Sequence, residues 1–187
     1  VDGHSHPHLM QRLAGLHESA YLASKFVVLS MLVLVQSALL LGVLAIRMHF
    51  PSPGDVMPAP LEIYITVALS GIAGISLGLC ISAASSTPDK ATSLIPIVLV
   101  PQVLFAGVMF ALHHITRVLS DLVTSRAAVD ALSSIVDLNR LETPLPLPPE
   151  PDHAHTPAVL LSAWALIVGQ AVLFGAIAWW QLRRRKR

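Results

Sequence analysis

The stretch SSTPDKATSLIPIVLVPQVLFAGVMF (residues 85–110) decides the fold class, because it places two prolines inside strongly apolar sequence. Pro96 and Pro101 each remove a backbone donor and clash with the preceding turn, so they would break a helix in water. A membrane helix tolerates them, since neighbouring helices, hydroxyl groups and local water satisfy the freed carbonyls. The polar residues before them suit a helix start, with Thr87 as the cap and Pro88 at the first position. The stretch therefore predicts an irregular membrane helix.

The composition of the whole chain agrees with a membrane protein. Of the 187 residues, 54% are hydrophobic and 12% are charged, against roughly 25% charged in an average soluble protein. A span needs about 20 predominantly apolar residues, and charge is absent from four longer stretches: 26–46, 63–88, 91–116 and 153–182. A soluble domain with four core helices would need polar faces that these segments lack. We therefore expect an all-α, polytopic membrane domain (1–187) with spans at 21–47, 61–86, 88–112 and 157–182.

The basic residues indicate the orientation. The tail RRRKR (183–187) holds five of the twelve lysines and arginines, and such clusters prefer the cytoplasmic side. With four spans, both termini are then cytoplasmic, in a multi-pass protein of the plasma or inner membrane. Arg47 would lie at the outer side and is an exception to this preference. The formal net charge of +1 gives no field that would attract nucleic acid.

Three further segments lie outside the predicted spans. Residues 9–20 place Leu9, Leu13 and Leu16 on one side, which predicts a short amphipathic helix at the cytoplasmic face. Residues 115–140 carry too many charges for a span, so we expect an external amphipathic or re-entrant segment. Residues 141–156 are rich in proline and predict an extended linker.

Small residues recur at every fourth position of the second predicted span: Ser70, Gly74, Gly78 and Ser82. Such a stripe lets another helix approach closely, and we expect a packing interface there. The alternative is that the glycines fall there by chance.

The sequence offers no catalytic motif. It lacks a GxxxxGK[ST] phosphate loop and a G-x-S-x-G motif, and HESAY (17–21) lacks the second histidine of HExxH. No ionisable residue lies deep within a predicted span, which argues against an ion-coupled pump. Clustered histidines at 4–8, 113–114 and 153–155 have the spacing of metal ligands, but solvated loop residues are the favoured interpretation. We expect no catalytic residue, metal or cofactor on this chain.

Three stretches resemble one family. QRLAGLHESAYLASKFVVL (11–29) looks like the coupling helix and following span of the permease domain of type-2 ATP-binding-cassette (ABC) exporters, G-like subgroup. Residues 81–110 resemble that family's turn between its fourth and fifth spans, followed by an F-x-G pattern that begins at Phe105. Residues 119–139 resemble its external segment, with Ala127 where an aromatic residue is common.

The resemblance implies a permease that forms half of a substrate pathway and pairs with a second copy in the lipid membrane. ATP and Mg would belong to a nucleotide-binding domain that this chain does not contain. The chain would begin at the coupling helix and hold the family's third to sixth spans, as a fragment of a longer protein. The alternative is a membrane scaffold or channel-like subunit derived from the same family.

The resemblance also gives roles to individual residues. Four residues near the start of the chain would contact the ATPase: Arg12, Gly15, Glu18 and Tyr21. Pro96, Pro101 and Phe105 would shape a bend beside the transport pathway. A bent helix with a purely packing role is the open alternative for these three residues.

Overall fold

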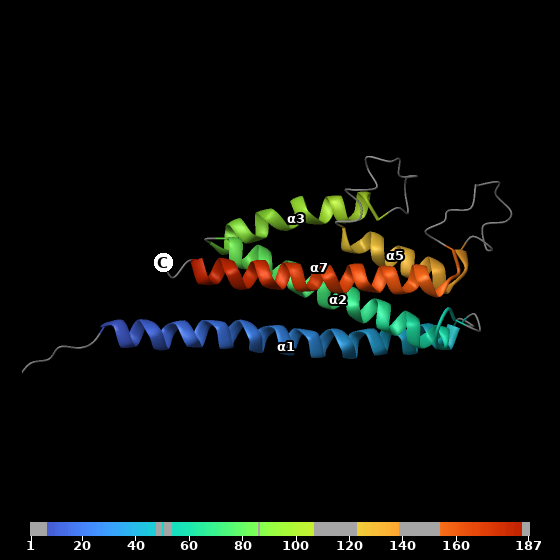
Figure 1. Ribbon diagram of the computed structural model, residues 1–187, viewed down its shortest axis with the longest axis horizontal. Helices are drawn as coiled ribbons and strands as arrows, with labels where there is room; N and C mark the ends of the chain where they lie inside the picture. The colour runs from blue at the N-terminus through green and yellow to red at the C-terminus, as the bar shows by residue number, and fades with distance from the viewer. Residues whose placement is uncertain are drawn as a thin grey trace, which may run out of the picture.

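The computed structural model describes residues 7–47, 50, 54–85, 87–106, 123–138 and 154–184, with side chains in the first helix from Leu22 onward. Within these residues the chain is all-helical, as expected. The helices are α1 (Pro7–Arg47), α2 (Ala59–Ala84), α3 (Pro88–Leu104), α5 (Thr124–Ile135) and α7 (Pro157–Arg184), drawn in Figure 1.

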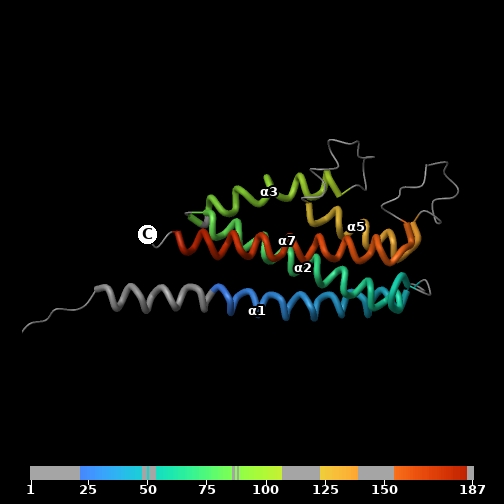
Figure 2. The backbone as a smooth tube through the Cα atoms, in the orientation of Figure 1, coloured from blue at the N-terminus to red at the C-terminus, as the bar shows by residue number. Residues whose placement is uncertain are grey.

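The helices form one elongated bundle with α2 at its centre. α2 packs against α7, α1, α5 and α3, and α5 also packs against α7. In the views of Figures 1 and 2, α3 and α5 lie one after the other on the side of the bundle opposite α1. α2 and α7 therefore carry most of the packing surface, with the other helices laid on them.

Three helices in the described part of the chain are long and apolar enough to cross a membrane: Leu22–Arg47, Ala59–Ala84 and Pro157–Arg184. The described residues therefore account for three of the four expected spans, and the fourth stays a prediction. α3 ends at Leu104 after 17 residues, which is about 26 Å of helix against a hydrocarbon thickness of about 30 Å. Residues 107–112 of the span expected at 88–112 lie outside the described residues.

The start of α3 follows the sequence expectation. Thr87 has extended backbone angles and its hydroxyl accepts a hydrogen bond from the Lys90 amide, at 3.4 Å. The helix then continues through Pro96 and Pro101 and ends in a turn, where the Phe105 amide donates to the Pro101 carbonyl at 2.9 Å. Both prolines are thus tolerated inside a helix, as a membrane location predicts.

α1 is a single helix of 41 residues, which includes both the short helix expected at 9–20 and the span expected at 21–47. The junction, HESAYLASK (17–25), contains no glycine or proline. Alanine, leucine, glutamate and lysine are strong helix formers, so nothing there ends the helix. The predicted amphipathic segment is therefore the first part of the same helix as the span.

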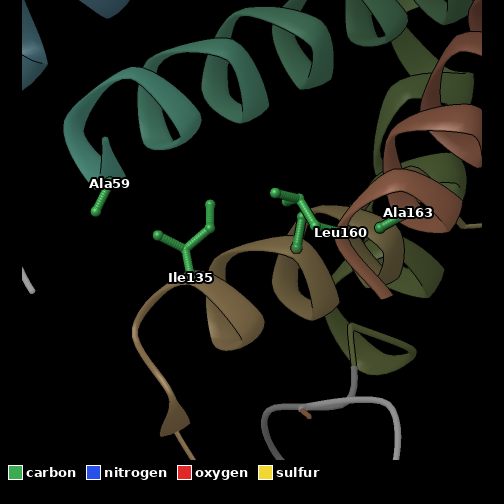
Figure 3. Packing of buried hydrophobic residues seen from close by; sticks show 5 residues of the cluster. Ala59, Ile135, Leu160 and Ala163 are labelled. Carbon is green, nitrogen blue, oxygen red and sulfur yellow. The ribbon is translucent and has the colours of Figure 1, made fainter. Parts of the chain in front are cut away.

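The buried face of α2 is made of small and polar residues. Its members recur at helical spacing and are Ala59, Glu62, Thr66, Ala73, Ser76 and Ala83. Opposite them, α7 buries Leu160, Ala163, Ile167, Gln170 and Ala178. Small side chains let the two helices approach closely, as in other membrane bundles. Figure 3 shows one end of this core, where Ala59, Ile135, Leu160 and Ala163 meet from three helices.

α5 is packed into this bundle and does not lie free on its surface. Seven of its residues are buried: Thr124, Arg126, Ala127, Ala131, Ser133, Ser134 and Ile135. Ala127 is 3% exposed and shares a cluster with Ala73 and Ile167. A large ring at position 127, where the resembling segment commonly has an aromatic residue, would overfill this contact.

Candidate functional site

A buried carboxylate organises the loop that leads into α2. Glu62 lies in the first turn of α2 and is 0% exposed. Its carboxylate accepts hydrogen bonds from the backbone amides of Asp55 (3.0 Å), Val56 (2.6 Å) and Met57 (2.7 Å). Three donors and the positive end of the helix compensate the buried charge. A Cβ at Gly54 would collide with this carboxylate and with the Met57 carbonyl, so glycine is required there.

The same loop is tied to α5 and α7 through Asp55. The Asp55 side chain is fully buried, and its Oδ2 accepts from the Ser134 hydroxyl at 2.5 Å. Oδ1 lies 2.9 Å from Nδ1 of His155, just before α7. Nδ1 of His155 is also 2.8 Å from the Ser134 carbonyl. We call Asp55, Ser134 and His155 the clasp, because they join three segments at one end of the bundle.

Two further polar contacts lie deeper in the bundle. The Trp164 indole donates to the Thr66 hydroxyl at 2.9 Å, which links α7 to α2. On α5, Nε of Arg126 lies 3.1 Å from the Asp130 carboxylate, with the Arg126 side chain only 5% exposed. Low-dielectric surroundings strengthen such contacts. The Trp164–Thr66 bond therefore holds α7 against α2, whereas the Arg126–Asp130 pair compensates a buried charge within α5.

The small-residue stripe does not meet another described helix at its glycines. A Cβ added at Gly74 or Gly78 would have no heavy atom within 4 Å, whereas one at Gly71 would lie 2.5 Å from Cγ1 of Val33. The close approach of α1 to α2 is therefore at Gly71. Packing at Ser70, Gly74, Gly78 and Ser82 stays a prediction, and it would need a partner other than the described helices.

Instead, the stripe lines a groove of about 600 Å³ between α2, α3 and α5. Ser70, Gly74 and Gly78 lie along it, while Ser82 is not among its lining residues. Of the three residues expected beside a pathway, Pro96, Pro101 and Phe105, none lines this groove, although their neighbours on α3 do. We call this space the stripe groove.

The residues expected to contact an ATPase all lie on the helical backbone of α1. These residues are Arg12, Gly15, Glu18 and Tyr21, and their surroundings lie outside what the structure describes. Leu22, which follows them, lines an apolar groove of about 490 Å³ together with Trp179 of α7. The start of α1 therefore leaves the bundle at the end where α7 finishes in Arg183 and Arg184.

Metal-ligating chemistry is limited in the part of the chain that the structure describes. No group of three or more histidine, cysteine, aspartate or glutamate side chains there could hold a metal ion. His155, a member of a predicted histidine cluster, is engaged by Asp55 in the clasp. The roles of Glu62 and the clasp were not predicted from the sequence. A signal was present, because Asp55 and Glu62 lie seven positions apart at the start of a predicted span, just after Gly54.

Comparison with known proteins decides the family. The family model of the ABC-2 family transporter proteins matches residues 6–180. This chain belongs to the ABC-2 transporter family. It is 29% identical, over 181 residues, to the ABC transporter ATP-binding/permease protein Rv1747 of Mycobacterium tuberculosis. That alignment covers 92% of this chain and 20% of the relative, so the chain spans about a fifth of the relative's length.

Membership in the ABC-2 family fits the geometry. The chain is the membrane domain of a transporter, a permease, and a multi-pass membrane protein with three described helices long enough to span. Large apolar side chains on α1 point outward, including Met31 at 64% and Leu39 at 66% exposure, as lipid-facing residues do. Membrane domains of this family work with an ATP-binding partner, and the relative's name includes an ATP-binding part.

Proposed function

We propose that this chain is the transmembrane permease part of an ATP-driven exporter of the G-like subgroup, forming half of a substrate pathway. A second permease copy completes the pathway, and a nucleotide-binding domain, encoded in the same protein or separately, binds ATP and Mg and hydrolyses the ATP. The single observation that best supports this coupling is the continuity of α1 through residue 21.

A continuous helix transmits movement as a rigid body. The part of α1 before Leu22 is 15 residues, about 22 Å of helix beyond the span. A push on residues 9–20 would therefore move the membrane-spanning part of α1, and through it α2, which α1 contacts at Gly71. This gives the proposed contact residues Arg12, Gly15, Glu18 and Tyr21 a mechanical path into the bundle.

The proposed orientation puts this path on the correct side of the membrane. Arg183 lies 5.0 Å from the ring centre of Trp179, and Arg184 lies 3.7 Å from that of Trp180. Tryptophan and arginine pairs of this kind are typical of a membrane interface, with the basic residues on the cytoplasmic side. Because α1 starts at this same end, its first turns would face a cytoplasmic ATPase.

The coupling is tested with two variants of the full-length protein in proteoliposomes, Gly15→Trp and Glu18→Arg. We expect nucleotide binding and membrane insertion to persist while substrate-stimulated ATP hydrolysis and export fall together, by about tenfold or more. Gly42→Trp is the matched control, because a Cβ at Gly42, on the same helix, meets nothing within 4 Å. Export at the normal rate in both variants would mean that residues 9–20 only anchor the chain to the membrane. That result would contradict the coupling role.

A further inference from the structure

The stripe groove has free space where the sequence led us to expect a helix contact. Its floor is Ser70, Gly74 and Gly78 of α2, and no heavy atom lies within 4 Å of a Cβ built on either glycine. α3 and α5 form its walls. A volume of about 600 Å³ falls in the range of small-molecule pockets, roughly 300–1,000 Å³.

One end of the groove holds a buried hydroxyl without a partner. Thr124, the first residue of α5, is 7% exposed and lines the groove. Its Oγ1 has no hydrogen-bond partner among the described residues. The polar groups beside it are used differently: Ser125 donates its amide to Oε1 of Gln102 at 3.1 Å and its hydroxyl to the Gln102 carbonyl. A buried polar group without a hydrogen-bond partner is unfavourable. A ligand with a polar atom near Thr124 Oγ1 would therefore be stabilised in the groove.

The rest of the lining excludes charge. Apart from the polar residues already named, the groove is lined by aliphatic side chains: Leu77, Ile81, Ile95, Val98, Leu99, Ala128 and Val129. No Asp, Glu, Lys or Arg is among these lining residues. A charged ligand would be buried here without a counter-charge, at a high cost. An apolar body with a neutral polar group fits both parts of the lining.

We propose that the stripe groove binds a neutral amphiphile, with its apolar body along Gly74 and Gly78 and one hydrogen-bonding group, such as an amide, on Thr124. The proposal rests on the transport function above, because it names the class of molecule that the permease handles. A helix of a second copy would leave the Thr124 hydroxyl buried and unpaired if it set only aliphatic side chains on the stripe. The amphiphile satisfies that hydroxyl and also fills the space above the glycines.

Photolabelling of the full-length protein in nanodiscs without nucleotide tests the site. The probe is an N-dodecyl acetamide with a diazirine on its chain, and its attachment is mapped by mass spectrometry. We expect labelling of α2 and α3 beside the groove, retained in Thr124→Ser and weakened about three- to tenfold in Thr124→Val by loss of one hydrogen bond. Gly78→Leu should abolish labelling by filling the groove. Gly169→Leu is the matched control, since a Cβ at Gly169 also meets nothing within 4 Å but lies outside the groove.

Three results would overturn the proposal. Equal labelling by a diazirine dodecane without the amide, together with an unchanged Thr124→Val, would show a groove filled by lipid chains. Disulfide cross-linking of Gly78→Cys between two copies, with exclusion of the probe, would show a subunit interface. ATP-dependent export that is unaffected by Gly78→Leu would remove this site from the pathway. A different result would overturn the transport function alone. If the probe binds as expected but the protein exports nothing in the presence of ATP, the proposed binding site is retained and the proposed transport function is wrong.

Discussion

Asp55 and His155 are 100 positions apart in the sequence, and the His155 Nδ1 lies 2.9 Å from the Asp55 Oδ1. The contact joins the loop before α2 to the start of α7, while Ser134 at the end of α5 donates to the other oxygen of Asp55. Below it lies the apolar cluster of Ala59, Ile135 and Leu160. The clasp therefore fixes the ends of three helices directly above the core that they share.

The clasp should be visible as an energetic coupling. We expect the effects of Asp55→Ala and His155→Ala on the free energy of unfolding to be non-additive by about 0.5–1.5 kcal/mol, because each removes the same contact. The His155 side chain is 34% exposed, so solvent screening keeps the value at this modest level. Unfolding by SDS titration in mixed micelles measures it. Asp55→Ala combined with Ser162→Ala, an exposed position on α7 whose hydroxyl bonds within its own helix, is the control pair. Additivity in the first pair would contradict the clasp.

Glu62→Gln should destabilise the protein although it removes only a charge. Glutamine has one acceptor oxygen for the three amides that Glu62 now satisfies, and its NH₂ group would face an N–H donor. The expected loss is about 1–3 kcal/mol. Leu61→Ala, at the neighbouring 45% exposed position, should change stability by no more than about 0.5 kcal/mol. Equal effects of the two substitutions would mean that the carboxylate does not hold the loop.

The helical class was predictable from the sequence because it depends on long uncharged segments alone. The starts of α3 and α7 were readable too, since Thr87 before Pro88 and Thr156 before Pro157 are local signals. Three of the four expected spans are found among the described residues, and the fourth stays a prediction. The sequence did not indicate that α3 ends at Leu104, since no single residue there marks a helix end. The sequence analysis did not predict that α1 is continuous, because its first part is more polar than the following span. The residues at the junction are strong helix formers, so the helix continues through them.

The site was less predictable, for a different reason. Spacing showed that Ser70, Gly74 and Gly78 share a face of α2, but only the positions of α3 and α5 reveal that this face borders open space. Gly71, one residue away from the stripe, makes the close contact. The buried state of Arg126 depends likewise on how α5 lies against its neighbours. Such features follow from the packing between distant segments, which periodicity within one segment does not contain.

Gly71 and Gly74 should respond oppositely to the same substitution. Gly71→Ala places a methyl group 2.5 Å from Cγ1 of Val33 and should destabilise the α1–α2 contact by about 1–3 kcal/mol. Gly74→Ala meets no neighbour and should be neutral or stabilising by about 0.5–1 kcal/mol, because alanine favours the helix. SDS titration of the purified protein compares the two.

The double variant Val33→Ala/Gly71→Ala provides the control for this comparison. It should recover most of the stability that Gly71→Ala loses, since the smaller Val33 replacement leaves room for the new methyl group. If Gly74→Ala proves as damaging as Gly71→Ala, the stripe packs against another helix, as the sequence first suggested, and that helix is not among the described ones.

The orientation of the bundle can be measured directly by thiol labelling in intact cells. On a Cys80→Ala background, Val56→Cys places a thiol in the loop before α2, where the native side chain is 53% exposed, and Arg184→Cys places one at the end of α7. Because basic residues stay on the cytoplasmic side, an impermeant maleimide should label Val56→Cys from outside. Arg184→Cys should be labelled only after permeabilisation, and a Thr87→Cys variant, at the turn between α2 and α3, should behave in the same way. The reverse pattern would place the start of α1 outside the cell, where no cytoplasmic ATPase could act on Arg12 or Glu18.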